Sequence, residues 1–176
     1  MKKIIAFAGS NSSTSINKQL ATYAASLVEG VEVDILDLNN YEMPMYSKDR
    51  EEASGHPIEA IAFVDKIRNS DGVIVSLAEY NGAYTGAFKN IFDWASRVEQ
   101  KTFLGKPMLL MSTSPGARGG QSVLGMANNR FPLHDANIVG KFSLPSFNDN
   151  FQGGAITNQE LKKQFLEVVK DFNKSI

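Results

Sequence analysis

Cysteine is absent from the sequence, which excludes disulfides, iron–sulfur clusters and thiolate chemistry on this chain. Histidine is scarce. His56 and His134 do not stand at a spacing typical of metal ligands, so we expect no metal site. The formal net charge is only −1, which does not favour nucleic acid or an anionic membrane surface as a partner. No apolar run approaches the roughly 20 residues that a membrane-spanning helix needs.

The first residues are similar to the start of a secretory signal, because Lys2 and Lys3 precede the apolar run 4–8. That run has five residues, whereas the core of a signal peptide needs about seven or more. A first β-strand accounts for the run better, and we expect a cytoplasmic protein.

The composition is that of an ordinary globular protein, with 43% hydrophobic residues, and the length of 176 residues suits a single domain over residues 1–176. Strand-like apolar runs alternate with helical periods along the chain. The expected strands are 4–8, 31–37, 72–77, 106–112 and 134–139, and the expected helices are 16–27, 57–69, 84–98, 121–131 and 161–172. This order predicts an α/β three-layer sandwich, in which a five-stranded parallel sheet in the order 2-1-3-4-5 has helices on both faces.

Three segments have less regular patterns. Residues 39–56 show no period, and we expect a surface excursion whose Met43, Met45 and Tyr46 either cover a ligand or pack under the loop. Residues 140–155 are expected to be irregular. Residues 157–160 (TNQE) have the pattern of a capping box that opens the last helix.

Three polar loops follow the first, third and fourth expected strands, and each contains a glycine or follows one. They are Ser10–Asn17 after Gly9, Ala78–Ala83, and Thr113–Gly120. The carboxyl ends of parallel strands meet at one edge of a sheet, so we expect these loops to converge. The first loop has hydroxyls and amides but no acid, which favours a phosphate at the helix N-terminus. Its alternative interpretation is a simple polar turn with Ser13 or Ser15 as the N-cap.

The second loop offers Tyr80 for stacking and Asn81 for an amide contact, and Gly82 lets the backbone approach closely. Together the three loops favour a phosphorylated planar ligand such as flavin mononucleotide (FMN). Other nucleotide and hydrolase signatures are absent: the sequence has no G-x-G-x-x-G after the first strand, no Walker A motif and no G-x-S-x-G.

Three motifs together resemble the NADPH-dependent FMN reductase family: Gly9-Ser10 with Ser15–Asn17, residues 79–82 (EYNG) and residues 86–94 (GAFKNIFDW). The resemblance covers about Lys2 to Lys170. It implies a flavodoxin-like fold and the activity of a quinone, azo-dye or chromate reductase. It also implies a homodimer or homotetramer that forms through helices near the flavin, with helix 88–94 as the candidate interface.

By the same resemblance, Ser10, Ser15 and Asn17 hold the FMN phosphate. Glu79, Tyr80 and Asn81 line the ribityl chain and ring, largely through backbone groups, and Thr113 and the glycines after it lie beside the ring. The full set expected at the cofactor is Ser10, Ser12, Ser15, Ile16, Asn17, Ala78, Glu79, Tyr80, Asn81, Gly82, Thr113 and Gly116. Arg118 is a candidate contact for the NADPH 2′-phosphate, or a solvated loop residue.

The chain departs from the family pattern at three positions. Ser12 stands where the family usually has arginine, so we expect the phosphate to rely on neutral donors, with Lys18 as another available cation. Ala78 and Thr85 stand where the family has prolines, which predicts a less rigid second loop.

The expected reaction is ping-pong hydride transfer from NADPH or NADH through FMN to a small-molecule acceptor. It requires no side-chain acid or base, so we name no catalytic residue. Two alternatives stay open: a flavodoxin-like electron-transfer or regulatory module without nicotinamide turnover, and a protein that has lost the flavin.

Overall fold

The structure is a computed structural model that describes residues 1–176. Its centre is a five-stranded sheet in the order β2-β1-β3-β6-β7, and every neighbouring pair is parallel. The strands of the sheet are β1 (Lys2–Gly9), β2 (Val31–Leu36), β3 (Gly72–Leu77), β6 (Pro107–Thr113) and β7 (Asn137–Leu144). Counted within the sheet, this is the predicted order 2-1-3-4-5, and the prediction is confirmed.

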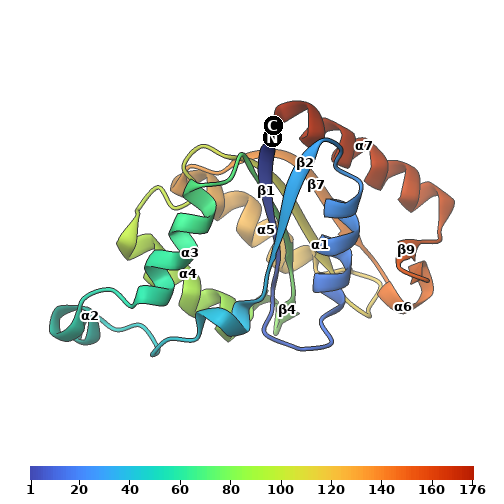
Figure 1. Cartoon of the computed structure of the whole chain (residues 1–176). Coiled ribbons are helices and arrows are strands. Elements are labelled where there is room, and N and C mark those ends of the chain that lie inside the picture. The colour runs from blue at the N-terminus through green and yellow to red at the C-terminus, as the bar shows by residue number, and fades with distance from the viewer.

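Helices cover both faces of the sheet (Figure 1). One face packs against α1 (Ile16–Ser26) and α7 (Gln159–Ser175), and the other packs against α3 (Ile58–Arg68), α4 (Gly86–Val98) and α5 (Gln121–Arg130). The short elements are η1 (Leu38–Tyr41), α2 (Lys48–Ser54), β4 (Glu79–Tyr80), β5 (Ala83–Tyr84), η2 (Phe131–His134), α6 (Phe147–Asn150), β8 (Phe151–Gln152) and β9 (Ala155–Ile156). None of the helices combines the length and the apolar character needed to cross a membrane.

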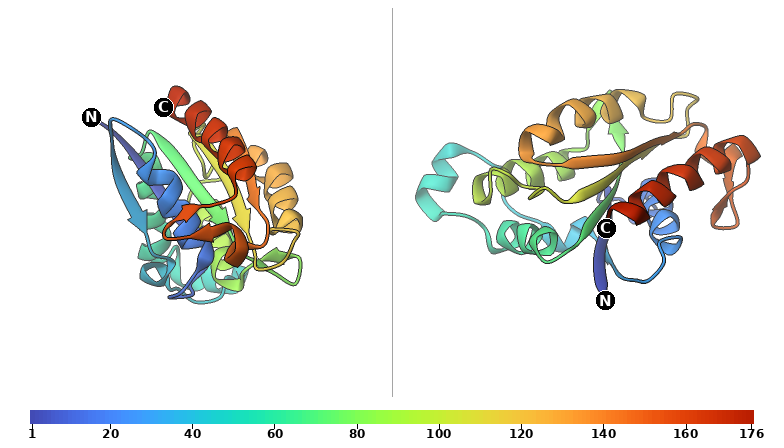
Figure 2. Two further views of the ribbon diagram at one scale, coloured as in Figure 1. Left: turned by 90° about the vertical axis from the view of Figure 1, so that its right-hand side faces the viewer. Right: turned by 90° about the horizontal axis from the view of Figure 1, so that it is seen from above.

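The side chains of the central strands point alternately to the two faces of the sheet, and the interior therefore consists of two apolar clusters, one on each face. In β1, Ile5 and Phe7 face the cluster under α3, α4 and α5, while Ile4 and Ala6 face the cluster under α1 and α7. Successive side chains of a strand point to opposite faces, so each central strand contributes to both clusters. Figure 2 shows the sheet between the two helical layers. This burial on both faces explains why β3 has a continuously apolar sequence.

The last strand was predicted too early in the chain. Of the predicted strand 134–139, His134 is instead the last residue of η2 (Phe131–His134). The strand β7 begins at Asn137 and runs through Gly140 to Leu144, which we had expected to be irregular. The strand has glycine at position 140 because α7 crosses it closely there. A Cβ at Gly140 would lie 3.1 Å from Leu109 Cδ1 and 3.2 Å from the Val168 carbonyl oxygen. A glycine in a strand can mark such a close approach rather than a break.

Two helix starts test the capping predictions. Ser15 is the N-cap of α1, and its Oγ accepts a hydrogen bond from the Lys18 N–H at 3.2 Å. The capping box at 157–160 was wrong, because Asn158 is the N-cap of α7 and accepts from the Leu161 N–H at 3.1 Å. An asparagine oxygen satisfies the same free N–H groups as the predicted threonine.

The segment after β2 is more ordered than predicted, since it contains η1 and α2. Helix α2 buries none of its residues and lies away from the sheet in Figure 1. Its connection to the body depends on Trp94, whose Nε1 donates to the Pro44 carbonyl at 2.7 Å, and on Tyr46, whose ring packs edge-on against Trp94. Arg97 adds an ion pair with Glu51 at 3.0 Å. Tyr46 therefore packs under the loop.

Gly72 begins β3 under the C-terminal end of α7, and a Cβ there would lie 2.8 Å from the Phe172 ring and 2.6 Å from Ile176 Cγ2. We predict that Gly72→Ala lowers the free energy of unfolding by about 1–3 kcal/mol, because the helix end must shift. Chemical denaturation measures the change. The control is Gly125→Ala, at an exposed position of α5 with nothing near the added Cβ, which should stabilise by up to about 1 kcal/mol. Equal effects of the two substitutions would contradict the packing argument.

Candidate functional site

A cavity of about 230 Å³ lies at the carboxyl ends of β1, β3 and β6, where the three polar loops meet. Its lining is Ser10, Ser12, Thr14, Ser15, Ile16, Asn17, Ala78, Glu79, Tyr80, Thr113, Ser114 and Pro115. Of the residues expected at the cofactor, only Asn81, Gly82 and Gly116 do not line it. Thr14, Ser114 and Pro115 were missed, although each is adjacent in sequence to a predicted residue.

Asn17 joins the first loop to the strands beside it. Its side chain is 2% exposed, and its Oδ1 accepts from the Ser76 Oγ at 2.7 Å and from the Thr113 N–H at 3.0 Å. Its Nδ2 donates to the Thr113 carbonyl at 3.1 Å. These bonds connect α1 with β3 and β6 in the interior, where an unmade hydrogen bond is costly. The amide of Asn17 is thus engaged within the protein and fixes the geometry of the cavity.

The first turn of α1 retains free donors towards a ligand. The backbone N–H groups of Ile16 and Asn17 have no hydrogen-bond partner within the chain. The Ser10 Oγ accepts from the Ser12 N–H at 3.1 Å and the Ser15 Oγ caps the helix, which leaves both hydroxyl hydrogens free to donate. Two free N–H groups at the positive end of a helix dipole, with hydroxyls beside them, favour an anion.

The second loop is a two-residue β-hairpin formed by β4 and β5. Asn81 and Gly82 occupy its turn with φ of 52° and 77°, the positive values that a type I′ turn requires. This turn places both residues at the tip, which explains why they do not line the cavity. An Asn-Gly pair is also the typical sequence of such a turn, and this hairpin was not predicted. Tyr80 lines the cavity and is 54% exposed, so part of its ring is open to solvent.

Hydrogen bonds hold this hairpin, and one of the residues that form them is Thr85, which stands where the family usually has proline. Thr85 Oγ1 donates to the Gly9 carbonyl at 2.9 Å and accepts from the Phe88 N–H at 3.1 Å, so it joins the end of β1 to the start of α4. Glu79 Oε2 accepts from the Val123 N–H at 2.9 Å, in the first turn of α5. The prediction of a less rigid loop took no account of these bonds.

The third loop is shaped by its glycines. A Cβ at Gly119 would lie 2.8 Å from the Leu144 carbonyl oxygen, and the φ of +58° is one that other residues rarely adopt. The Gly119 carbonyl accepts from both the Ser112 and Ser143 hydroxyls, at 2.8 and 2.9 Å. The Gly116 carbonyl accepts from the Ser146 N–H at 2.9 Å. Gly116 thus anchors the loop rather than lining the cavity.

No cationic side chain lines the cavity. Lys18 forms an ion pair with Asp37 at 2.7 Å, and the hydrogen bond from its ammonium lowers the pKa of Asp37 to about 2. Arg118 is exposed, and its Nη2 donates to the Ser122 Oγ at 3.3 Å. An anion in the cavity would therefore be held by backbone N–H groups, hydroxyls and the helix dipole.

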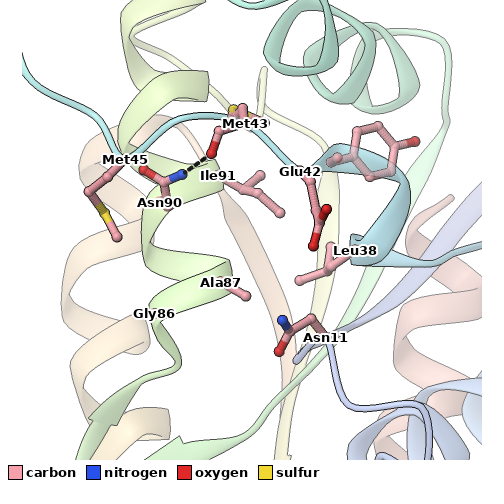
Figure 3. Close-up of a pocket in the computed structure, with 10 residues that line it drawn as sticks. Asn11, Leu38, Glu42, Met43, Met45, Gly86, Ala87, Asn90 and Ile91 are labelled. Carbon is pink, nitrogen blue, oxygen red and sulfur yellow. Dashed lines mark hydrogen bonds between the residues drawn. The ribbon is translucent and has the colours of Figure 1, made fainter. Parts of the chain in front are cut away.

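A larger cavity, of about 500 Å³, lies between η1 with the segment after it and the first half of α4, and Asn11 of the first loop borders it. Figure 3 shows Asn11, Leu38 and Glu42 along one side, and Ala87, Asn90 and Ile91 of α4 along the other. The segment after η1 covers it, held by hydrogen bonds from Asn90 Nδ2 to the Met43 and Pro44 carbonyls. Met43 and Met45 line this cavity, and Met43 also packs against the apolar cluster under α3, α4 and α5.

Similarity to known proteins agrees with this architecture. A family model described as NADPH-dependent FMN reductase matches residues 2–149. A quinone reductase of Escherichia coli strain K12 is 31% identical over 118 residues, which cover 67% of this chain and 59% of that protein. A 2-hydroxy-1,4-benzoquinone reductase of a Burkholderia species is 40% identical over 119 residues, covering 66% of this chain and 63% of that protein. The chain thus spans about three fifths of the length of the curated relatives it matches.

Among solved structures, a flavoenzyme NAD(P)H:(acceptor) oxidoreductase from Paracoccus denitrificans superposes with a TM-score of 0.75. It is 25% identical, and the superposition covers 99% of each chain. This agreement extends along the whole sheet and both helical layers, and the family model spans all three loops of the cavity. The chain therefore belongs to the NADPH-dependent FMN reductase family.

Proposed function

We propose that residues 1–176 form one FMN-binding domain that oxidises NADPH or NADH and reduces a quinone, an azo compound or a similar small acceptor. The observation that carries the proposal is the convergence of three polar loops on one cavity, with free N–H groups at the start of α1. The matched relatives named quinone reductases support the class of acceptor. NAD(P)H is abundant in the cytoplasm, and we propose that compartment.

The residues present fit FMN. The N–H groups of Ile16 and Asn17 and the hydroxyls of Ser10 and Ser15 would hold the phosphate, because they are donors without acid nearby in the loop. Ser12 and Thr14 add further hydroxyls to the same wall. The loop around Ala78–Gly82 would contact the ribityl chain and ring, with the partly exposed Tyr80 beside it. Thr113 and the loop through Gly116 would close the opposite side.

When bound, FMN supplies the two-electron chemistry that links the nicotinamide donor to the acceptor. The protein contributes position and hydrogen bonds, and no side chain of the site is required to transfer a proton. The hairpin and the third loop are each fixed by hydrogen bonds to the sheet or to α5, which keeps the stacking surface constant between the two half-reactions. Constant geometry is the main requirement for hydride transfer between stacked rings.

We propose a homodimer or homotetramer, as the family resemblance implies. Helix α4 is the candidate interface, but its large side chains belong to the interior: Phe88 and Trp94 are each 1% exposed. The surface that α4 leaves to a partner is polar and includes Arg97 and the Lys89–Asp93 ion pair at 2.7 Å. An interface there would depend on charged and polar contacts.

We predict that the FMN-loaded protein oxidises NADPH or NADH in the presence of a simple benzoquinone. Initial rates at several quinone concentrations should give parallel double-reciprocal lines, because donor and acceptor use one site in turn. Protein stripped of flavin should be inactive until FMN is added. Bound FMN without any oxidation of either nicotinamide would favour the electron-transfer or regulatory alternative instead.

A second prediction concerns Asn17. Replacing it with alanine leaves the Thr113 N–H, the Thr113 carbonyl and the Ser76 hydroxyl without their partner, so we expect Asn17→Ala to lower the free energy of unfolding by about 2–3 kcal/mol. We also expect the affinity for FMN to fall by about tenfold or more, because the first loop is no longer held in place against β3 and β6. Calorimetric titration and denaturation measure both. The control is Asn129→Ala, at an exposed position of α5, and unchanged FMN affinity in Asn17→Ala would contradict the role assigned to this bridge.

A further inference from the structure

A third cavity lies between α4 and α5. Its volume is about 370 Å³, within the range of about 300–1,000 Å³ usual for ligand pockets. It shares no lining residue with the cavity at the strand ends. We call it the α4–α5 groove, and its lining is Tyr84, Lys89, Phe92, Asp93, Ser96, Met126, Arg130 and His134.

The α4–α5 groove follows from the register of two helices. Its α4 wall consists of positions 89, 92, 93 and 96, which recur at intervals of three and four residues and so lie on one side of the helix. Its α5 wall consists of Met126 and Arg130, four residues apart. Tyr84 of β5 and His134 of η2 complete the lining. Side chains from four elements therefore converge on this volume.

The α4–α5 groove has one positive charge that nothing in the chain neutralises. Lys89 and Asp93 neutralise each other, since the Lys89 Nζ lies 2.7 and 2.8 Å from the two carboxylate oxygens of Asp93. Arg130 is exposed, and its guanidinium forms no ion pair or hydrogen bond within the chain. His134 brings no negative charge, and its Nδ1 lies 2.9 Å from the Gln100 carbonyl oxygen. The lining therefore favours a ligand with a single negative charge.

A second polar group of the groove also lacks a partner. The hydroxyl oxygen of Tyr84 is the one buried side-chain nitrogen or oxygen of the chain without a hydrogen bond. Burial raises the pKa of Tyr84 to about 12, so the hydroxyl keeps its proton at neutral pH and remains a donor. The charge of Arg130 opposes this rise in pKa, so the guanidinium lies near enough to act on the hydroxyl. An unpaired buried donor costs free energy, which an acceptor on a ligand would recover.

We propose that the α4–α5 groove binds a small aromatic carboxylate. The carboxylate would accept hydrogen bonds from the Arg130 guanidinium, which is suited to two parallel bonds with such a group, and from the Tyr84 hydroxyl. Arg130 and Met126 are exposed, so both side chains can turn outwards and open the hydroxyl to the ligand. Met126 is 40% exposed, and its thioether would pack against the aromatic ring. The proposal does not depend on FMN, because the groove shares no residue with the cavity that we assign to the flavin.

The test uses the purified protein with FMN added and two probes of the same ring system, 2-naphthoate and the uncharged 2-naphthylmethanol. Calorimetric titration gives the dissociation constant of each probe, and the visible spectrum reports whether a probe stacks on the flavin. Arg130→Gln removes the unpaired charge, and Tyr84→Phe removes only the hydroxyl. Arg118→Gln is the matched control, because Arg118 is also exposed but lies outside the groove. Thermal unfolding establishes that each variant is folded.

We expect 2-naphthoate to bind at one site per chain and to leave the flavin bands unchanged, and 2-naphthylmethanol to bind at least about tenfold more weakly. Arg130→Gln should weaken the binding of 2-naphthoate by about tenfold or more, and Tyr84→Phe by about fivefold or more. Tyr84→Phe should unfold at the same or a higher temperature, because it loses an unpaired hydroxyl. Arg118→Gln should leave the binding of 2-naphthoate unchanged.

The absence of 2-naphthoate binding, or binding that Arg130→Gln leaves unchanged, would overturn the proposal. Weaker binding in Arg118→Gln together with shifted flavin bands would also overturn it and assign the probe to the FMN cavity. Loss of an oligomer in Arg130→Gln, without any binding of 2-naphthoate to the unaltered protein, would instead assign the groove to an acidic side chain of a second copy.

Discussion

The side-chain amide of Asn17 is the interaction on which the site depends. It is buried at the point where α1 leaves the first loop, and it satisfies the Ser76 hydroxyl and both backbone groups of Thr113. One residue thereby sets the distance between the phosphate-facing turn and the strands β3 and β6. With its side chain used in this way, Asn17 can serve a phosphate only through its backbone N–H. In the proposed FMN site, Asn17 would thus combine a positioning side chain with a phosphate-binding main chain.

The other parts of the site follow the same rule, since polar side chains fix the backbone and the backbone faces the cavity. Thr85 ties the hairpin to Gly9, Glu79 ties it to α5, and two serine hydroxyls hold the Gly119 carbonyl. None of these contacts introduces a positive charge into the cavity. The proposed FMN site would therefore have no cationic side chain, and its one acid, Glu79, accepts from the Val123 N–H. A phosphate there would depend on the helix dipole and the N–H geometry, which tolerates serine at position 12.

Sequence periodicity sufficed for the sheet order and both helical layers, because buried parallel strands and amphipathic helices leave clear patterns. It failed where one residue has two uses. Gly140 suggested a break but allows α7 to cross β7, and Asn81-Gly82, expected at the ligand, also forms a hairpin turn that we had not predicted. The bonds of Asn17 and Glu79 reach 96 and 44 residues along the chain, to Thr113 and Val123, and no local pattern reports contacts at such separations. Residue identities at the site were accessible from the sequence, whereas the division between binding and positioning roles was not.

The central claim is that the cavity between the three loops holds FMN in a form that a nicotinamide can reduce. The most direct measurement is the visible spectrum of the purified protein with added FMN, after removal of unbound flavin, before and after anaerobic NADPH or NADH. The account predicts retained flavin bands that bleach on addition of at least one of the two nicotinamides. Retained bands that neither nicotinamide bleaches, or no retained flavin, would contradict it.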